Sequence, residues 1–143
     1  MDDHFAPRPI AGWYMPAAIA SLLFMLLGCA TFLMNVTQNP ASLPLDQRAM
    51  FEAQPVWITA AFGISSIVGA VGALMLVLRR KAAQELMLLS LLAIMVWLAG
   101  LLAAPGFHDL ASTRDIALAI AVLLITWTIF WFARHSRQRG WLK

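Results

Sequence analysis

The sequence has few charged residues. Asp, Glu, Lys and Arg make up 12% of its 143 residues, and the hydrophobic set makes up 62%. A soluble domain usually has about 25% charged and about 45–50% apolar residues. The shortage of charge therefore excludes an ordinary water-soluble domain. No charged residue occurs at positions 56–78 or 86–104, and each of these segments is close to the roughly 20 residues that cross a bilayer as a helix.

Four such apolar segments predict an all-α membrane protein with transmembrane helices at about 16–35, 56–78, 86–104 and 116–133. The remaining residues form short connections, so residues 1–143 are expected to be one transmembrane domain with no room for a soluble enzyme domain. Short connections between helices favour antiparallel neighbours. We therefore expect an up-down antiparallel four-helix bundle.

Two local signals refine this prediction. In the loop at 36–55, Pro44 and Pro55 bracket a stretch at 45–54 that predicts a short helix on the membrane surface. Ser112 and Asp115 have the spacing of a helix capping box, which would begin the fourth long helix at residue 112.

The basic residues predict the orientation in the membrane. Eight of the ten Lys and Arg residues lie in the head, the second connection and the tail: Arg8, Arg79, Arg80, Lys81, Arg134, Arg137, Arg139 and Lys143. Because basic residues accumulate in short cytoplasmic segments, both termini are expected to be cytoplasmic. We also expect lipid headgroups to be bound by the cations beside the membrane, namely Arg79, Arg80, Lys81, Arg134 and Arg137.

The predicted spans contain no Asp, Glu, Lys, Arg or His. Proton relays and ion-coupled transporters normally need an ionisable group inside the membrane, so coupled pumping is not expected. A single cysteine, Cys29, excludes an internal disulfide. His4, His108 and His135 all lie outside the spans, which argues against a haem or metal site in the membrane. We therefore expect no cofactor.

An enzymatic activity is not expected either. The outward loops offer few acids and bases to an enzyme acting on lipid, namely Asp46, Glu52, His108 and Asp109. The basic residues form no stripe interleaved with aromatic residues, so we expect no nucleic-acid partner.

Four aromatic residues lie near the ends of the predicted spans. Trp13, Tyr14, Trp57 and Trp131 are expected to anchor the protein at the membrane interfaces. Trp97 and Trp127 lie deeper, where they could line a cavity but are better explained by packing.

Small residues recur every four positions in the second predicted span. They are Ala61, Ser65, Gly69 and Ala73, with Gly72 beside them. Small residues let helix backbones approach closely in lipid. This small-residue stripe could pack within the bundle, or it could dock another copy of the chain or a larger complex.

Uncharged polar residues gather at the end of the first predicted span. Thr31, Asn35, Gln38 and Asn39 could bind a neutral polyhydroxylated solute. They could equally bind lipid headgroups and water.

Several segments carry a family resemblance in their order and spacing. They are MNVT at 34–37, PVWITAAF at 55–62, Gly69 and Gly72, LVLRRKA at 76–82, Ser90 and Leu91, FAR at 132–134, and GWLK at 140–143. With them the chain resembles a family of small four-span bacterial inner-membrane proteins of uncharacterised function, loosely labelled sugar transporters. The resemblance implies a bacterial inner-membrane protein and no established activity.

Two functions are consistent with these features. The first is an accessory or structural subunit that packs against a larger membrane complex or against itself, as the small-residue stripe indicates. The alternative is an oligomeric carrier for a neutral small solute such as a sugar, as the polar residues and the resemblance indicate. The expected partners are the lipid bilayer and a protein in the membrane.

Overall fold

The computed structural model describes residues 9–106, 109 and 111–143. It contains four long helices, α1 (Tyr14–Thr37), α3 (Val56–Val77), α4 (Ala82–Ala103) and α6 (Thr113–Gln138). They cover the four predicted spans to within one residue. With 22 to 26 residues each, they are about 33–39 Å long, which exceeds the roughly 30 Å hydrocarbon core of a bilayer. Their length and hydropathy make this a multi-pass membrane protein.

The loop between α1 and α3 contains the short helix expected from its prolines. A 3-10 turn, η2 (Pro40–Ser42), is followed by α2 (Leu45–Ala53), which confirms the prediction of a helix at 45–54. Proline 44 precedes the first residue of α2, and a second proline at 55 precedes the first residue of α3. Proline fits these positions because its φ angle suits the start of a helix and its missing N–H has no partner there.

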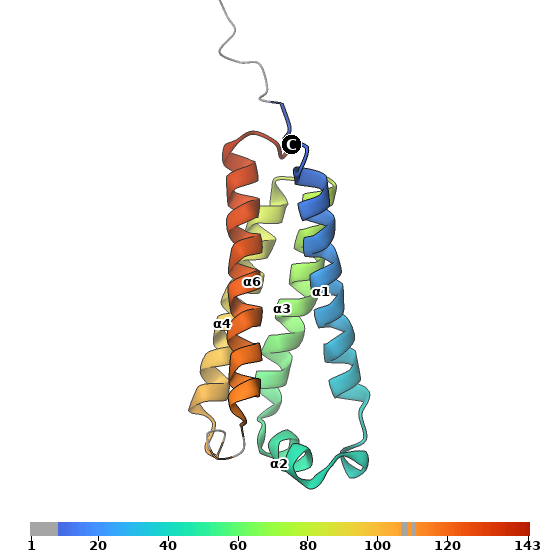
Figure 1. Ribbon diagram of the computed structural model, residues 1–143, viewed down its shortest axis with the longest axis vertical. Coiled ribbons are helices and arrows are strands. Elements are labelled where there is room, and N and C mark those ends of the chain that lie inside the picture. Colours follow the sequence, from blue (N-terminus) through green and yellow to red (C-terminus); the bar gives the residue numbers. More distant parts are fainter. Residues whose placement is uncertain (1–8, 107–108, 110) are drawn as a thin grey trace, which may run out of the picture.

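The four long helices run alternately in opposite directions (Figure 1). Helix α3 packs against α1 and α4, and α4 packs against α6. The start of α1 and the end of α6 lie at the same end of the bundle, called here the termini end. Helix α2 lies across the opposite end, called here the α2 end. This arrangement confirms the prediction of an all-α four-helix bundle, and the described residues include no β-strand.

The small-residue stripe lies inside the bundle. Ala61, Ser65 and Ala73 are at most 9% exposed, and Gly69 and Gly72 are also buried. The stripe is covered by α1 on one side and α4 on the other. This placement corrects the interpretation in which these five residues form an outward face for another copy or a larger complex, because neighbouring helices of the same chain already cover them.

The glycines of the stripe set how closely the helices approach. A Cβ atom added to Gly69 would lie 2.6 Å from the sulfur of Met25 in α1 and 2.8 Å from the hydroxyl oxygen of Ser90 in α4. A Cβ atom added to Gly72 would lie 2.8 Å from the sulfur of Met87. Real side-chain carbons do not approach other atoms this closely, so a larger residue at either position would displace the side chains that pack against it.

Two serines join α3 to α4 beside these glycines. The Ser65 hydroxyl donates to the Ser90 carbonyl oxygen over 2.9 Å, and the Ser90 hydroxyl donates to the Ser65 carbonyl oxygen over 2.7 Å. Both side chains are buried. Hydrogen bonds between helices add to packing in lipid, where apolar burial provides little drive for association.

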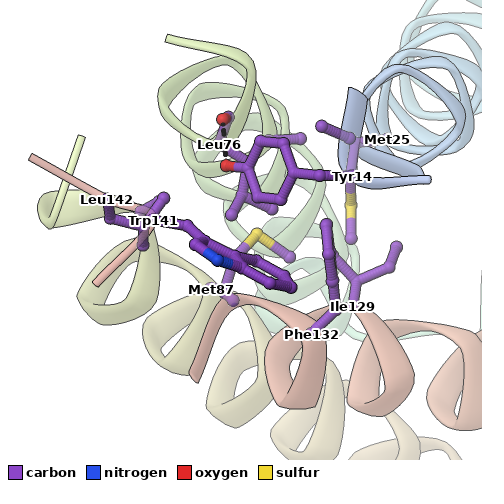
Figure 2. Packing of buried hydrophobic residues seen from close by; sticks show 12 residues of the cluster. Tyr14, Met25, Leu76, Met87, Ile129, Phe132, Trp141 and Leu142 are labelled. Carbon is purple, nitrogen blue, oxygen red and sulfur yellow. Dashed lines mark hydrogen bonds between the residues drawn. The ribbon is translucent and has the colours of Figure 1, made fainter. Parts of the chain in front are cut away.

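At the termini end, an aromatic cluster joins α1, α3, α6 and the C-terminal residues (Figure 2). The Tyr14 hydroxyl donates to the Leu76 carbonyl oxygen over 2.6 Å. The Tyr14 ring centroid lies 5.4 Å from that of Phe132 and 5.8 Å from that of Trp141. Tyr14 is only 1% exposed, so its prediction as an interface anchor was wrong. The phenol group bonds a carbonyl of α3 instead of reaching the membrane surface.

The C-terminal residues pack back onto the turn between α3 and α4. Gly140 follows α6 with a φ angle of +73°, which lets the chain reverse direction. The Lys143 amide donates to the Arg79 carbonyl over 2.6 Å, and the Lys81 amide donates to the Lys143 carbonyl over 3.0 Å. Trp141 and Leu142 are buried beneath this pairing.

The fourth span begins as its capping signal predicts. The Asp115 amide donates to the Ser112 hydroxyl oxygen over 3.3 Å, and the Ser112 amide donates to the Asp115 carboxylate over 3.0 Å. These reciprocal bonds confirm the capping box at the start of α6.

Replacing Tyr14 by phenylalanine is expected to lower the free energy of unfolding by about 1–2 kcal/mol, because the buried Leu76 carbonyl loses its bond to the phenol. Unfolding of the purified protein by sodium dodecyl sulfate in mixed micelles measures the change. Thr128→Val is the control, since the Thr128 hydroxyl only bonds a carbonyl of its own exposed helix face. Equal effects of the two substitutions would contradict the assigned role of Tyr14.

Gly69→Ala is expected to lower the free energy of unfolding by about 1–3 kcal/mol through overpacking. The added methyl group would press against Ser90, whose hydroxyl is held by its bond to α3. Gly12→Ala is the matched control, because a Cβ atom there meets no atom within 4 Å. The same micelle titration compares them, and an unchanged unfolding midpoint for Gly69→Ala would refute the close α1–α3–α4 contact.

Candidate functional site

A pocket of about 220 Å³ lies at the α2 end of the bundle. Four side-chain amides line it: Asn35, Gln38, Gln47 and Gln54. The rest of the lining is apolar and comes from four parts of the chain: Leu43, Met50, Phe51, Ala53, Ile58, Leu101, Ala104 and Pro105. We call this cavity the amide pocket. No charged side chain belongs to its described lining.

The amides are positioned by the ends of helices. Asn35 lies in the last turn of α1, and Gln38 directly follows that helix. Gln47 lies in α2, and Gln54 directly follows α2. The pocket therefore forms where α2 folds back over the ends of α1, α3 and α4, and its shape depends on the placement of α2.

The charges of α2 do not line the pocket. The Arg48 guanidinium Nε lies 2.8 Å from a carboxylate oxygen of Glu52, one helical turn away, and both side chains are about half exposed. Asp46 lies in the first turn of α2, where a negative charge is favourable to the helix dipole. The pocket itself is thus electrically neutral.

Amide groups give this pocket a defined chemistry. Each amide offers an acceptor oxygen and two N–H donors without a charge. In the described part of the chain, the four amide groups of the pocket make no hydrogen bond to the protein. Its volume is below the roughly 300–1,000 Å³ of pockets for drug-sized ligands. The site therefore suits a small, uncharged molecule that bears hydroxyl or carbonyl groups.

The structure separates the predicted polar residues. Asn35 and Gln38 line the amide pocket. The Asn39 side-chain oxygen instead accepts from the Ala41 amide over 3.0 Å and caps η2. Thr31 lines a second cavity of about 140 Å³ between α1 and α6, and its hydroxyl donates to the Leu27 carbonyl over 2.9 Å. Thr31 and Asn39 therefore do not belong to the amide pocket.

Sequence reasoning missed two of the four amides. Gln47 and Gln54 lie in the stretch at 45–54 that was predicted to form a short helix on the membrane surface. In the structure Met50 turns toward the bundle and lines the pocket with Gln47. Gln47 lies within α2 and Gln54 directly follows it, and only the packing of α2 against the bundle brings them beside Asn35 and Gln38.

No family model, curated protein or solved structure matches the chain. The resemblance to a family of small four-span proteins therefore stays a prediction.

The predicted lipid anchors at the termini end differ in their surroundings. Arg79 has a positive φ of 58°, and its guanidinium Nε donates to the Trp141 carbonyl over 3.1 Å. The Arg137 guanidinium lies 3.5 Å from a carboxylate oxygen of Glu85. Among the described residues, no such side-chain partner is found for Arg80, Lys81 or Arg134, and all three are exposed. Arg79 therefore holds the C-terminal residues in place.

The remaining candidate residues do not converge. Glu52 is paired with Arg48, and Asp46 lies at the start of α2. Asp109 lies in the connection between α4 and α6. His4, Arg8 and His108 lie outside the described residues. Within residues 9–106, 109 and 111–143, no three His, Cys, Asp or Glu side chains form a group that could hold a metal ion.

Arg79→Ala is expected to lower the free energy of unfolding by about 1–3 kcal/mol, because the buried end of the chain loses a charge-assisted bond. Arg80→Ala removes the same charge from the next position and is expected to change the free energy of unfolding by less than about 0.5 kcal/mol. Micelle unfolding measures both. If Arg80→Ala is as damaging as Arg79→Ala, charge near the membrane surface matters more than the bond to Trp141.

Proposed function

We propose that this protein binds a small, uncharged, hydrogen-bonding solute such as a sugar in the amide pocket, as part of a carrier in a bacterial inner membrane. The proposal rests on the lining of the pocket: four side-chain amides lie beside apolar side chains, and no charged residue lines the pocket. Sugars present hydroxyl groups that donate and accept, together with apolar C–H faces. A neutral pocket binds such groups without the desolvation cost of a buried charge.

The distribution of basic residues supports a pocket that faces the outside of the cell. The termini end carries most of the described Lys and Arg side chains and is the cytoplasmic end under the positive-inside rule. The amide pocket then opens toward the outside of the cell, where a solute would first be met. The resemblance to proteins labelled sugar transporters agrees with this assignment.

Transport would require more than one copy of the bundle. The amide pocket and the cavity between α1 and α6 share no lining residue, and four helices leave little room for a path between them. The absence of an ionisable residue in the predicted spans favours facilitated movement over ion-coupled pumping. We infer a homo-oligomer or a complex with another membrane protein, with no catalytic step.

The accessory-subunit function is a second candidate, and one observation favours it. Helices α1 and α6 meet through aromatic side chains at the termini end, whereas farther along a cavity of about 140 Å³ lies between them. A helix of a larger complex could fill this cavity. The protein would then copurify with that complex in a fixed ratio, and Leu27→Trp at the cavity would release it.

The binding test uses purified full-length protein in nanodiscs with radiolabelled glucose, glycerol and inositol as probes. We expect saturable binding of at least one probe and binding of gluconate at least about tenfold weaker, since its carboxylate has no cationic partner in the pocket. The double substitution Asn35→Leu and Gln54→Leu is expected to weaken binding about tenfold or more, because each change leaves polar groups of the solute unpaired.

Asn39→Ser is the matched control for the binding test. It removes a nearby amide that lies outside the pocket and keeps an oxygen that can cap η2, so binding is expected to be unchanged. Wild-type affinity in the double variant, or no saturable binding of the three probes, would overturn the proposed function. Copurification with a large complex, lost on Leu27→Trp, would then favour the accessory subunit.

A further inference from the structure

A groove of about 240 Å³ runs along the last turns of α6 at the termini end, far from the amide pocket. It is lined by Trp131, Arg134, His135 and Gln138. These positions are three or four residues apart, so they share one face of the helix. The groove combines one cation, two polar side chains and an aromatic ring.

Arg134 is the free cation of this groove. Within the described residues, Arg79 donates to the Trp141 carbonyl and Arg137 lies against Glu85, whereas no such partner is found for Arg134. Its guanidinium can offer two parallel N–H groups to the oxygens of a phosphate. Gln138, one turn farther along, adds an amide on the same face.

The His135 ring is held in the groove by two tryptophans. It stacks on Trp131 with a centroid distance of 5.3 Å and an interplanar angle of 16°. It also meets the edge of Trp141 at 5.8 Å and 81°. Because Trp141 is buried and its chain is pinned to the α3–α4 turn, the position of His135 is fixed by the fold. The fold therefore fixes the His135 side of the groove.

An apolar stripe leads into the groove from the membrane side. Ile120, Leu124, Trp127 and Trp131 follow one another along α6 and are 46%, 51%, 58% and 61% exposed. Their spacing of three or four residues places them on the same face as Arg134 and Gln138. The face thus changes from exposed apolar side chains to polar and cationic ones at Trp131, a residue type that is enriched at the membrane interface.

The charge around the groove fits an anionic occupant. The described part of the termini end carries the cations Arg79, Arg80, Lys81, Arg134, Arg137, Arg139 and Lys143, and the acidic side chain Glu85. Positive charge at a membrane surface attracts anionic lipids. A free phosphate would use the cation but not the apolar stripe, whereas a phospholipid would use both.

We propose that Trp131, Arg134, His135 and Gln138 bind the headgroup phosphate of an anionic phospholipid, whose acyl chain lies along the apolar stripe of α6. Arg134 binds the phosphate oxygens, His135 and Gln138 add hydrogen bonds, and Trp131 covers the glycerol region. This site lies at the other end of the bundle from the amide pocket and does not depend on a solute being bound there.

The test measures lipid binding to the purified full-length protein in detergent by native mass spectrometry. Phosphatidylglycerol is expected to bind at least about tenfold more tightly than phosphatidylcholine, and inorganic phosphate is expected not to compete. Arg134→Gln is expected to weaken phosphatidylglycerol binding about tenfold, because a charge-assisted bond is lost. Arg80→Gln is the matched control, since it removes an exposed cation from the same end outside the groove and should change affinity less than about twofold.

Each other outcome overturns the proposal. Equal losses in Arg134→Gln and Arg80→Gln would mean that only diffuse charge attracts lipid. Competition by inorganic phosphate at similar concentration would make the ligand a free phosphate, and equal binding of the two lipids would remove the headgroup site. If Arg134→Gln does not fold, Arg134→Lys replaces it: it keeps the charge without the planar fork and is expected to weaken binding about threefold, whereas Arg80→Lys has no effect.

Discussion

The close approach of α3 to α1 and α4 is the contact on which the rest of this structure depends. An apolar side chain gains little free energy when it moves from lipid into a helix interface, because both surroundings are apolar. Helices in a membrane therefore associate through close packing and a few hydrogen bonds. Gly69 and Gly72 remove the atoms that would hold the helices apart, and Ser65 and Ser90 bond across the gap. With α3 at the centre, α1 and α4 are placed on either side of it, and α6 follows from α4.

The two ends of the bundle are closed in different ways. At the termini end, Tyr14 bonds the last turn of α3, and the C-terminal residues pair with the α3–α4 turn through Arg79. This end is cationic. At the α2 end, a short helix between two prolines covers the bundle and leaves a neutral pocket lined by amides. The amide pocket and most of the described cationic side chains thus lie at the ends, whereas helix packing dominates the middle of the bundle.

This division is consistent with the shortage of charge in the chain. A span without Asp, Glu, Lys, Arg or His costs little to insert in a membrane. Amides and hydroxyls are the polar groups that remain, and most hydroxyls within the spans bond backbone carbonyls, as those of Thr31, Thr126 and Thr128 do. The four amides of the pocket, at the end of α1 and in or just after α2, make no hydrogen bond to the described part of the chain, so their donors and acceptors are available for a ligand.

The sequence by itself determined the four helices, the short helix between its prolines and the capping box at Ser112, because these features depend on hydropathy and on neighbouring residues. It also identified Asn35 and Gln38 as candidates for a polar site. Only the tertiary structure decided that the small-residue stripe faces inward, that Tyr14 is buried and that Gln47 and Gln54 complete the pocket. The physical reason is the membrane: its apolar interior and the protein core favour the same side chains, so hydropathy cannot tell which face of a helix meets lipid and which meets another helix.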